Sequence, residues 1–219
     1  MPDIATINGI DITTLASFGG VAFADGQTLD GQNVALVSDA HTFISSQTAS
    51  ASSSLSFTSG IDSTYDVYEF HFINIHPATQ HVHWQFQANA SGGSGFNETI
   101  TSSHFIAYNN EAGTDTSLSY SASHDQAQGT AYQNMFYNLD YENDESCSGI
   151  LTLYAPSSTT YVKHFVSRVQ GNHHSSNYSM ESNVAGYINT TSAIDEIDFK
   201  FSSGNIDAGE VRMYGVATS

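Results

Sequence analysis

Three histidines in two alternating segments have the clearest capacity for metal chemistry. His81 and His83 are two positions apart, so a β-strand would project both imidazoles to one side. His71 lies in the preceding alternating segment beside Glu69, and a hairpin between the segments would bring a third ligand within reach. Such spacing suits zinc, copper or nickel. Alternatively, the imidazoles fill polar positions on a Tyr/Gln/His-rich sheet or pack around an oligomer axis, so we assign no metal and expect no cofactor.

Two acidic clusters raise the question of carboxylate catalysis. The first comprises Asp140, Glu142, Asp144 and Glu145, and the second comprises Asp195, Glu196 and Asp198. Paired carboxylates hydrolyse glycosides when they are held about 5 to 10 Å apart. The first cluster is more typical of a solvated loop or a calcium site, although the EF-hand spacing is absent. The second lies with Lys200 in an alternating segment and is interpreted as an ordinary wet strand face.

Nucleophilic and nucleotide chemistry find little support in the sequence. The single cysteine, Cys147, has acidic neighbours that disfavour a thiolate, so we expect a small, half-buried residue at a strand edge. His173 and His174 fall in a polar stretch that is interpreted as a loop. No P-loop, dinucleotide-binding glycine motif, nucleophile elbow or zincin motif is present. We therefore predict that the chain is not an enzyme.

Binding is the more natural use of this composition. Tyrosine, serine, asparagine and glycine on β loops make adaptable polar contacts around aromatic platforms, which suits sugar recognition. The candidate exposed tyrosines are Tyr108, Tyr120, Tyr132, Tyr137, Tyr141 and Tyr178. Trp84 is instead expected in the core.

From about residue 55 the sequence alternates between apolar and polar residues, which predicts strands with one buried face. The segments around residues 68–72 and 82–87 are predicted to pair as a hairpin. Further strands are predicted at 100–108, 117–121, 149–154, 161–169, 182–188, 194–201 and 210–216. A short helix within 126–139 is conceivable, although Gly129 argues against it. About nine strands at this spacing indicate an all-β fold, a jelly-roll-like β-sandwich preceded by an extended N-terminal arm.

The predicted organisation is an arm at 1–44, a Ser/Ala/Thr-rich linker at 45–58, and the β-sandwich domain at 59–219. The arm consists of short apolar pieces between turn dipeptides such as Asn8-Gly9. These pieces are too short to form a core, so we expect them to dock on a partner. The predicted partner-binding residues are Ile7, Ile10, Ile12, Leu15, Phe18, Val21 and Phe23. We detect no internal repeat.

The charge pattern restricts the partners. No lysine or arginine precedes Lys163, and the formal net charge is −18. Nothing before that position can neutralise phosphates, which argues against nucleic acid and anionic membranes as partners. The start of the chain lacks the basic and apolar regions of a signal peptide, so we expect synthesis and folding in a cytoplasm.

Several segments are similar to a family of proteins. They are Ser63–Phe70, Pro156–Phe165, Ala185–Ile194, Phe199–Ile206 and Met213–Val216. Together they resemble virion structural proteins of tailed bacteriophages that infect marine bacteria and cyanobacteria. The Ile7-Asn8-Gly9-Ile10 segment also resembles short Asn-Gly repeats found in such proteins.

The resemblance implies a location in the virion, jelly-roll domains, and a homo-oligomer that is often a trimer. It carries no catalytic residues. We therefore expect a non-enzymatic protein on the particle surface, as capsid decoration or as a fibre or spike, anchored to other virion proteins by its arm. The alternative is a tail-mounted receptor-binding module that recognises host surface glycans. A polysaccharide hydrolase is the third hypothesis.

Overall fold

The computed structural model describes residues 41–173 and 178–216 with their side chains, and only six short strands, as backbone, within residues 1–40. Contacts divide the chain into two compact units, residues 1–40 and residues 41–219. Each unit is described by itself below.

The N-terminal unit contains three antiparallel hairpins of two-residue strands. Their strands are β1 (Thr6–Ile7) with β2 (Ile10–Asp11), β3 (Ser17–Phe18) with β4 (Val21–Ala22), and β5 (Thr28–Leu29) with β6 (Gln32–Asn33). The hairpins begin 11 residues apart, at Thr6, Ser17 and Thr28. Two-residue connections that contain glycine favour tight hairpin turns. The expectation of no internal repeat was therefore wrong for this unit.

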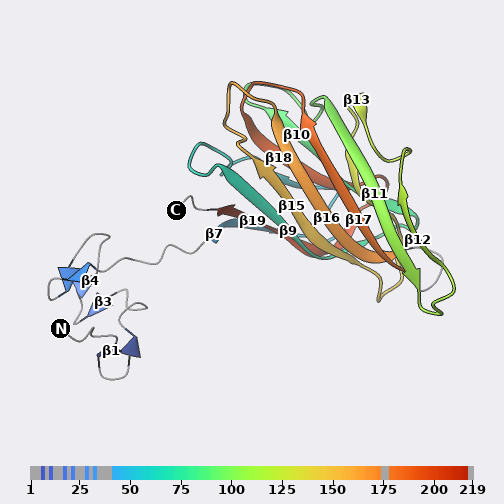
Figure 1. The fold of residues 1–219 in the computed structure, drawn as a ribbon, viewed down its shortest axis with the longest axis horizontal. Coiled ribbons are helices and arrows are strands. Elements are labelled where there is room, and N and C mark those ends of the chain that lie inside the picture. Colours follow the sequence, from blue (N-terminus) through green and yellow to red (C-terminus); the bar gives the residue numbers. More distant parts are fainter. Residues whose placement is uncertain are drawn as a thin grey trace. The chain divides into compact units, whose positions relative to one another are not determined.

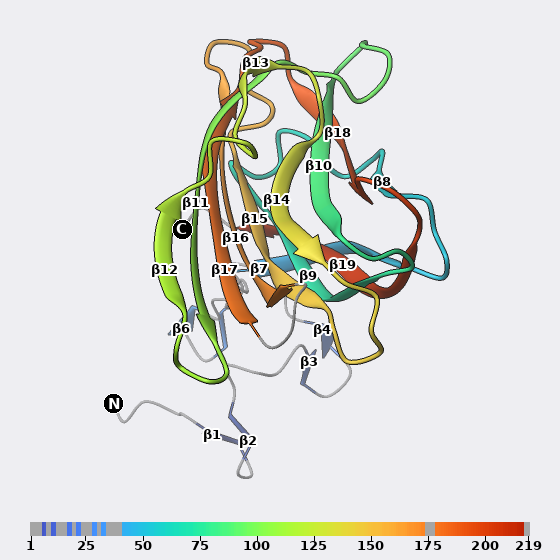
Figure 2. The same cartoon turned by 90° about the vertical axis from the view of Figure 1, so that its right-hand side faces the viewer.

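The second unit is a β-sandwich of two antiparallel sheets, which confirms the predicted fold class (Figures 1 and 2). The larger sheet has the order β12 (Thr116–Tyr120), β11 (Ile100–Asn110), β17 (Tyr178–Ile188), β16 (Lys163–His173), β15 (Cys147–Tyr154), β9 (Val67–Pro77), β19 (Ile206–Val216) and β7 (His41–Thr48), with β13 (Ala127–Gly129) also paired to β11. The smaller sheet has the order β14 (Gln133–Leu139), β10 (Val82–Ala90), β18 (Ile194–Phe201) and β8 (Leu55–Phe57). The edge-on view in Figure 2 separates the two layers.

The predicted hairpin between the two histidine-bearing segments does not form. β9 pairs with β15 and β19 in the larger sheet, whereas β10 pairs with β14 and β18 in the smaller one. The chain therefore crosses between the sheets repeatedly, since β8, β10, β14 and β18 lie in the smaller sheet and the strands before and after each of them lie in the larger one.

Two local expectations are corrected. Residues 45–58 are not a free linker, because residues 45–48 belong to β7, which pairs with β19, and β8 pairs with β18. The segment 126–139 contains β13 and β14 and no helix. Ala49 and Leu55 are buried, so this Ser-rich stretch is held by its few apolar side chains.

Aromatic rings fill the space between the sheets. Phe70 and Phe72 from β9 meet Phe199 from β18 with ring centroids 5.4 and 5.2 Å apart. Trp84 is fully buried, as predicted, and stacks on Phe199 at 5.9 Å. Its indole nitrogen has no hydrogen-bond partner. Large buried rings supply most of the apolar area that stabilises such a sandwich.

Close packing within the larger sheet requires glycine at Gly149 on β15. A Cβ there would lie 2.7 Å from the Val169 Cα and closer still to the Arg168 carbonyl oxygen. The register of β15 against β9 is irregular at this point, between Cys147 and Gly149. A missing side chain lets β16 approach the bulged strand.

Candidate functional site

A pocket of about 340 Å³ lies at one end of the sandwich, between β14 of the smaller sheet and β11, β16 and β17 of the larger one. Its lining includes Tyr108, Asp115, Tyr137, Asn138, His173 and Tyr178. Met180 adds an apolar floor residue. The volume falls at the lower end of the range of small-molecule sites, about 300 to 1,000 Å³.

Four rings of this pocket form a continuous series of edge-to-face contacts. Tyr108 and Tyr178 lie 5.5 Å apart at 81°, Tyr178 and His173 lie 6.1 Å apart at 81°, and His173 and Tyr137 lie 5.5 Å apart at 81°. Aromatic pairs prefer such perpendicular packing. The consequence is a set of walls at right angles to one another, built from the four strands β11, β14, β16 and β17.

The polar residues of the pocket are positioned by local backbone structure. Asp115 lies just before β12, its amide donates to the Asn110 side-chain oxygen at 3.1 Å, and its carboxylate accepts from the Tyr178 hydroxyl at 2.7 Å. Asn138 has a positive φ of 54°, in a stretch where β14 pairs irregularly with β10. Such irregularities redirect side chains and are common beside binding sites.

Three further histidines support the pocket from behind Tyr137. His124 stacks on the Tyr137 ring with centroids 4.2 Å apart and an angle of 13°. His83 and His104 lie 5.3 and 5.9 Å from His124. His83 Nδ1 accepts from the Asn138 amide at 3.2 Å, so the cluster also holds the polar edge of the pocket.

Burial keeps these histidines uncharged. The pKa of His124 is lowered to about 4, first by desolvation and then by repulsion from His83 and His104. Desolvation also lowers the pKa of His83 and of His104, although the nearby Asp125 carboxylate and a backbone interaction oppose this at His104. His104 is fully buried, and its Nε2 lies 2.6 Å from the Ser182 hydroxyl. Uncharged rings can pack together where imidazolium ions would repel.

The three histidines considered as weak metal candidates do not come together. His71 lies on the larger sheet, where its Nε2 is 2.9 Å from the Glu69 carboxylate, and His41 approaches the same carboxylate at 3.1 Å. His83 is on the smaller sheet in the cluster beside Tyr137, and His81 is exposed outside the strands. Across residues 41–173 and 178–216, no group of three or more His, Cys, Asp or Glu side chains could hold a metal ion.

The acidic clusters have different environments. Asp144 and Glu145 line an open depression of about 490 Å³ together with His76 and Asp207, while Asp140 is buried and bonds the Tyr141 amide at 2.9 Å. The expectation that all members of the first cluster lie in a solvated loop therefore fails for Asp140.

The second cluster does not form a uniformly wet face. Asp198 is buried and accepts from the Ser56 hydroxyl at 2.5 Å and the Tyr132 hydroxyl at 2.8 Å. The Lys200 ammonium lies 3.9 Å from the centre of the Tyr132 ring. Desolvation, and then the bond to Asp198, raises the pKa of Tyr132. This carboxylate links β8, β18 and the start of β14, which is a structural role.

The tyrosine candidates separate into three groups. Tyr108, Tyr137 and Tyr178 are half-buried around the pocket, Tyr120 and Tyr141 are exposed, and Tyr132 is bonded to Asp198. Tyr154 and Tyr161 are exposed but were not predicted. Sequence reasoning also missed Asp115, Asn138 and His124. Since no motif marks them, only the tyrosine-rich composition indicated a site of this kind.

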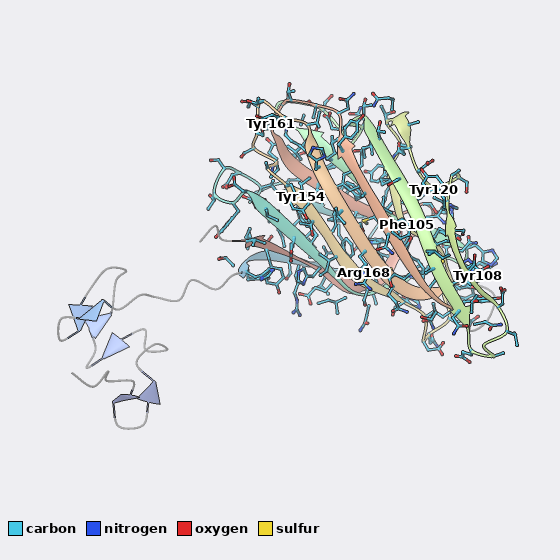
Figure 3. The ribbon with its side chains drawn as sticks, viewed as in Figure 1. Phe105, Tyr108, Tyr120, Tyr154, Tyr161 and Arg168 are labelled. Carbon is cyan, nitrogen blue, oxygen red and sulfur yellow. The ribbon has the colours of Figure 1, made fainter. Side chains whose placement is uncertain are left out.

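The outer face of the larger sheet carries other exposed apolar residues (Figure 3). Phe105 on β11 lies opposite Tyr120 on β12, and Leu118 of β12 is 74% exposed. Arg168, also on this face, pairs with Glu181. The face is therefore a mixture of apolar and charged side chains.

Two residues that the sequence singled out have structural roles. Cys147 is fully buried at the start of β15, not half-buried as expected, and burial raises the pKa of its thiol. Lys163 is also buried, and its ammonium donates to the carbonyl oxygens of Tyr161 and Thr190 at 2.9 and 3.1 Å. Desolvation lowers the Lys163 pKa, and attraction to Glu98 opposes that change.

The remaining predicted positions can be placed only partly. Ile7, Ile10, Phe18 and Val21 lie in the short strands β1 to β4, whose backbone alone is described. Ile12, Leu15, Phe23 and His174 lie outside the described residues. The predicted partner-binding arm therefore stays a prediction.

Comparison with protein-family models, curated proteins and solved structures finds no match to this chain. Within the part of the chain that the structure describes, no helix is long and apolar enough to cross a membrane.

Proposed function

We propose that this chain is a non-enzymatic structural protein of a tailed-phage virion, displayed on the particle surface as capsid decoration or as a fibre or spike. The observation that carries the proposal is the division into two units of different construction. Residues 41–219 contain a complete aromatic core, whereas residues 1–40 contain three hairpins of two-residue strands. A two-stranded hairpin is marginally stable by itself in water.

This construction suits attachment and display. The N-terminal unit gains stability by docking on other virion proteins, and the sandwich is stable enough to project from them. The resemblance of residues 63–70, 156–165, 185–194, 199–206 and 213–216 to virion structural proteins supports the same assignment. A net charge of −18 keeps a displayed domain soluble and disfavours adhesion to anionic polymers.

Deletion of residues 1–40 tests the attachment role. We expect the truncated protein to fold, with the fluorescence of the buried Trp84 unchanged, and to be absent from particles assembled in the host cytoplasm. Full occupancy of particles by the truncated protein would refute the anchor. Light scattering of the full chain in solution tests the trimer that the resemblance implies.

The second candidate is a tail-mounted receptor-binding module that recognises host glycans. The pocket of three tyrosines, one histidine and two polar side chains favours it, because such a site is built for a small ligand. A cryo-EM map of the intact particle would separate the two. Density on the capsid shell supports decoration, and density at a tail or fibre tip supports receptor binding.

A further inference from the structure

The pocket beside Tyr137 has a charge that restricts its ligand. The chain has only four lysine and arginine residues, Lys163, Arg168, Lys200 and Arg212, and none of them lines the pocket. Its lining contains one acidic residue, Asp115, in a protein of formal net charge −18. An anionic ligand would meet a carboxylate with no lysine or arginine in the lining to offset its desolvation. The ligand is therefore neutral or cationic.

The walls of the pocket are held in place before any ligand arrives. Tyr137 is fixed by its stack on His124, and Tyr178 is fixed by the bond from its hydroxyl to Asp115. Tyr108 and His173 each pack edge to face against Tyr178. Pre-organised aromatic walls lose little conformational entropy on binding, which favours affinity for a small molecule.

The polar groups of the pocket favour a neutral ligand over a cationic one. The Asp115 carboxylate and the Asn138 amide offer directional acceptors and a donor beside the rings. An organic cation such as choline would use the ring faces and the negative charge but no directional bond from an amide. A sugar has an apolar C–H face for a tyrosine ring and adjacent hydroxyls for a carboxylate and an amide.

We propose that this pocket binds one neutral sugar residue, with its apolar face against a tyrosine ring and its hydroxyls bonded to Asp115 and Asn138. The inference rests on the second candidate function, since it names the ligand class of that site. Sugar binding by the purified chain can nevertheless be measured without any assumption about the virion.

The test is ligand-observed NMR with the full-length protein and single ligands at millimolar concentration. The probes are glucose, galactose, mannose and N-acetylglucosamine, with N-acetylneuraminic acid as the anionic sugar and choline as the organic cation. We expect at least one neutral sugar to bind, and neither the anionic sugar nor choline to bind more tightly. Absence of binding by all four neutral sugars, or preferential binding of either comparison ligand, would overturn the inference.

Variants then locate the binding. Asp115→Asn removes a charged acceptor from an exposed loop and is expected to weaken the sugar by about tenfold. Tyr108→Ala removes a wall and is expected to abolish detectable binding. The matched control is Tyr161→Ala, because Tyr161 is 72% exposed and does not line the pocket. Equal loss in the control, or unchanged binding by both pocket variants, would place the sugar elsewhere.

The virion assignment and the sugar-binding pocket can be refuted independently of each other. A chain found in particles that binds no neutral sugar would refute the pocket assignment and leave the structural function intact. A chain that binds a neutral sugar in this pocket but is absent from purified particles would refute the virion assignment alone.

Discussion

The buried histidine cluster predicts that acid destabilises the sandwich through His124. The unfolded chain takes up a proton on this residue near pH 6.5, whereas the folded protein does so only near pH 4. Because the folded-state pKa is depressed, stability is complete above about pH 6.5 and is lost as the pH falls towards 4. Tyr137 faces His124 directly, and His83, His104, Asp125 and His173 surround the pair.

The size of this loss of stability follows from the difference between the folded-state and unfolded-state pKa of His124. Lowering the His124 pKa from 6.5 to about 4 on folding reduces the free energy of unfolding by at most about 3.4 kcal/mol, a limit reached when His124 is protonated in both the folded and the unfolded state. At pH 5.0 the corresponding limit is about 2 kcal/mol. His124 is partly accessible to solvent, so screening reduces the expected contribution to about 1 kcal/mol.

The assay compares the free energy of unfolding at pH 7.5 and pH 5.0 by urea titration, followed through the fluorescence of the single tryptophan, Trp84. pH 5.0 stays above the sequence pI of about 4.4. Wild type and His124→Gln are measured at both pH values, so that titration of the 22 acidic residues cancels between them. The wild type should lose about 1 kcal/mol more than the variant.

The control is His164→Gln, which changes an exposed histidine on the outer face and should behave as wild type. If wild type and His124→Gln lose the same stability to within about 0.3 kcal/mol, His124 is not held uncharged by the fold and the reasoning is refuted.

Three further predictions concern the packing and the buried hydrogen bonds, and each is tested by urea unfolding at pH 7.5. In Gly149→Val the new side chain would lie against the Val169 backbone, which should lower the free energy of unfolding by about 3 kcal/mol. The control Gly113→Ala adds a methyl group in open space at φ +66° and should lower it by only about 1 kcal/mol. Equal costs would contradict the clash. Trp84→Phe should cost far less than the roughly 3–5 kcal/mol of Trp84→Ala, because both remove the unpartnered indole donor but phenylalanine leaves a much smaller cavity; comparable costs for both would argue against this. Asp198→Ala should cost about 2–3 kcal/mol through two orphaned hydroxyls, and a neutral effect would show that these bonds do not stabilise the sheet.

Much of the candidate site lay beyond sequence reasoning. Tyrosine-rich composition indicated ligand binding, but six tyrosines were candidates and only three line the pocket. Asp115 and Asn138 carry no motif. They reach the pocket because β11 pairs with β17 and because β14 packs across the sandwich at that end. The predicted hairpin that would have brought His71 close to His83 does not form, because proximity in sequence does not decide which sheet a strand joins.

The sequence by itself determined the β class, most strand positions and the burial of Trp84, and it placed the end of the arm at residue 44, whereas the structure divides the chain after residue 40. These properties follow from period-2 alternation and turn dipeptides, which act over a few residues. Only the tertiary structure decided strand partners, the four-ring pocket, the histidine cluster behind Tyr137 and the burial of Asp198 and Lys163. An alternating strand specifies which of its faces is buried but not which strand lies beside it, because that choice depends on contacts across the whole core.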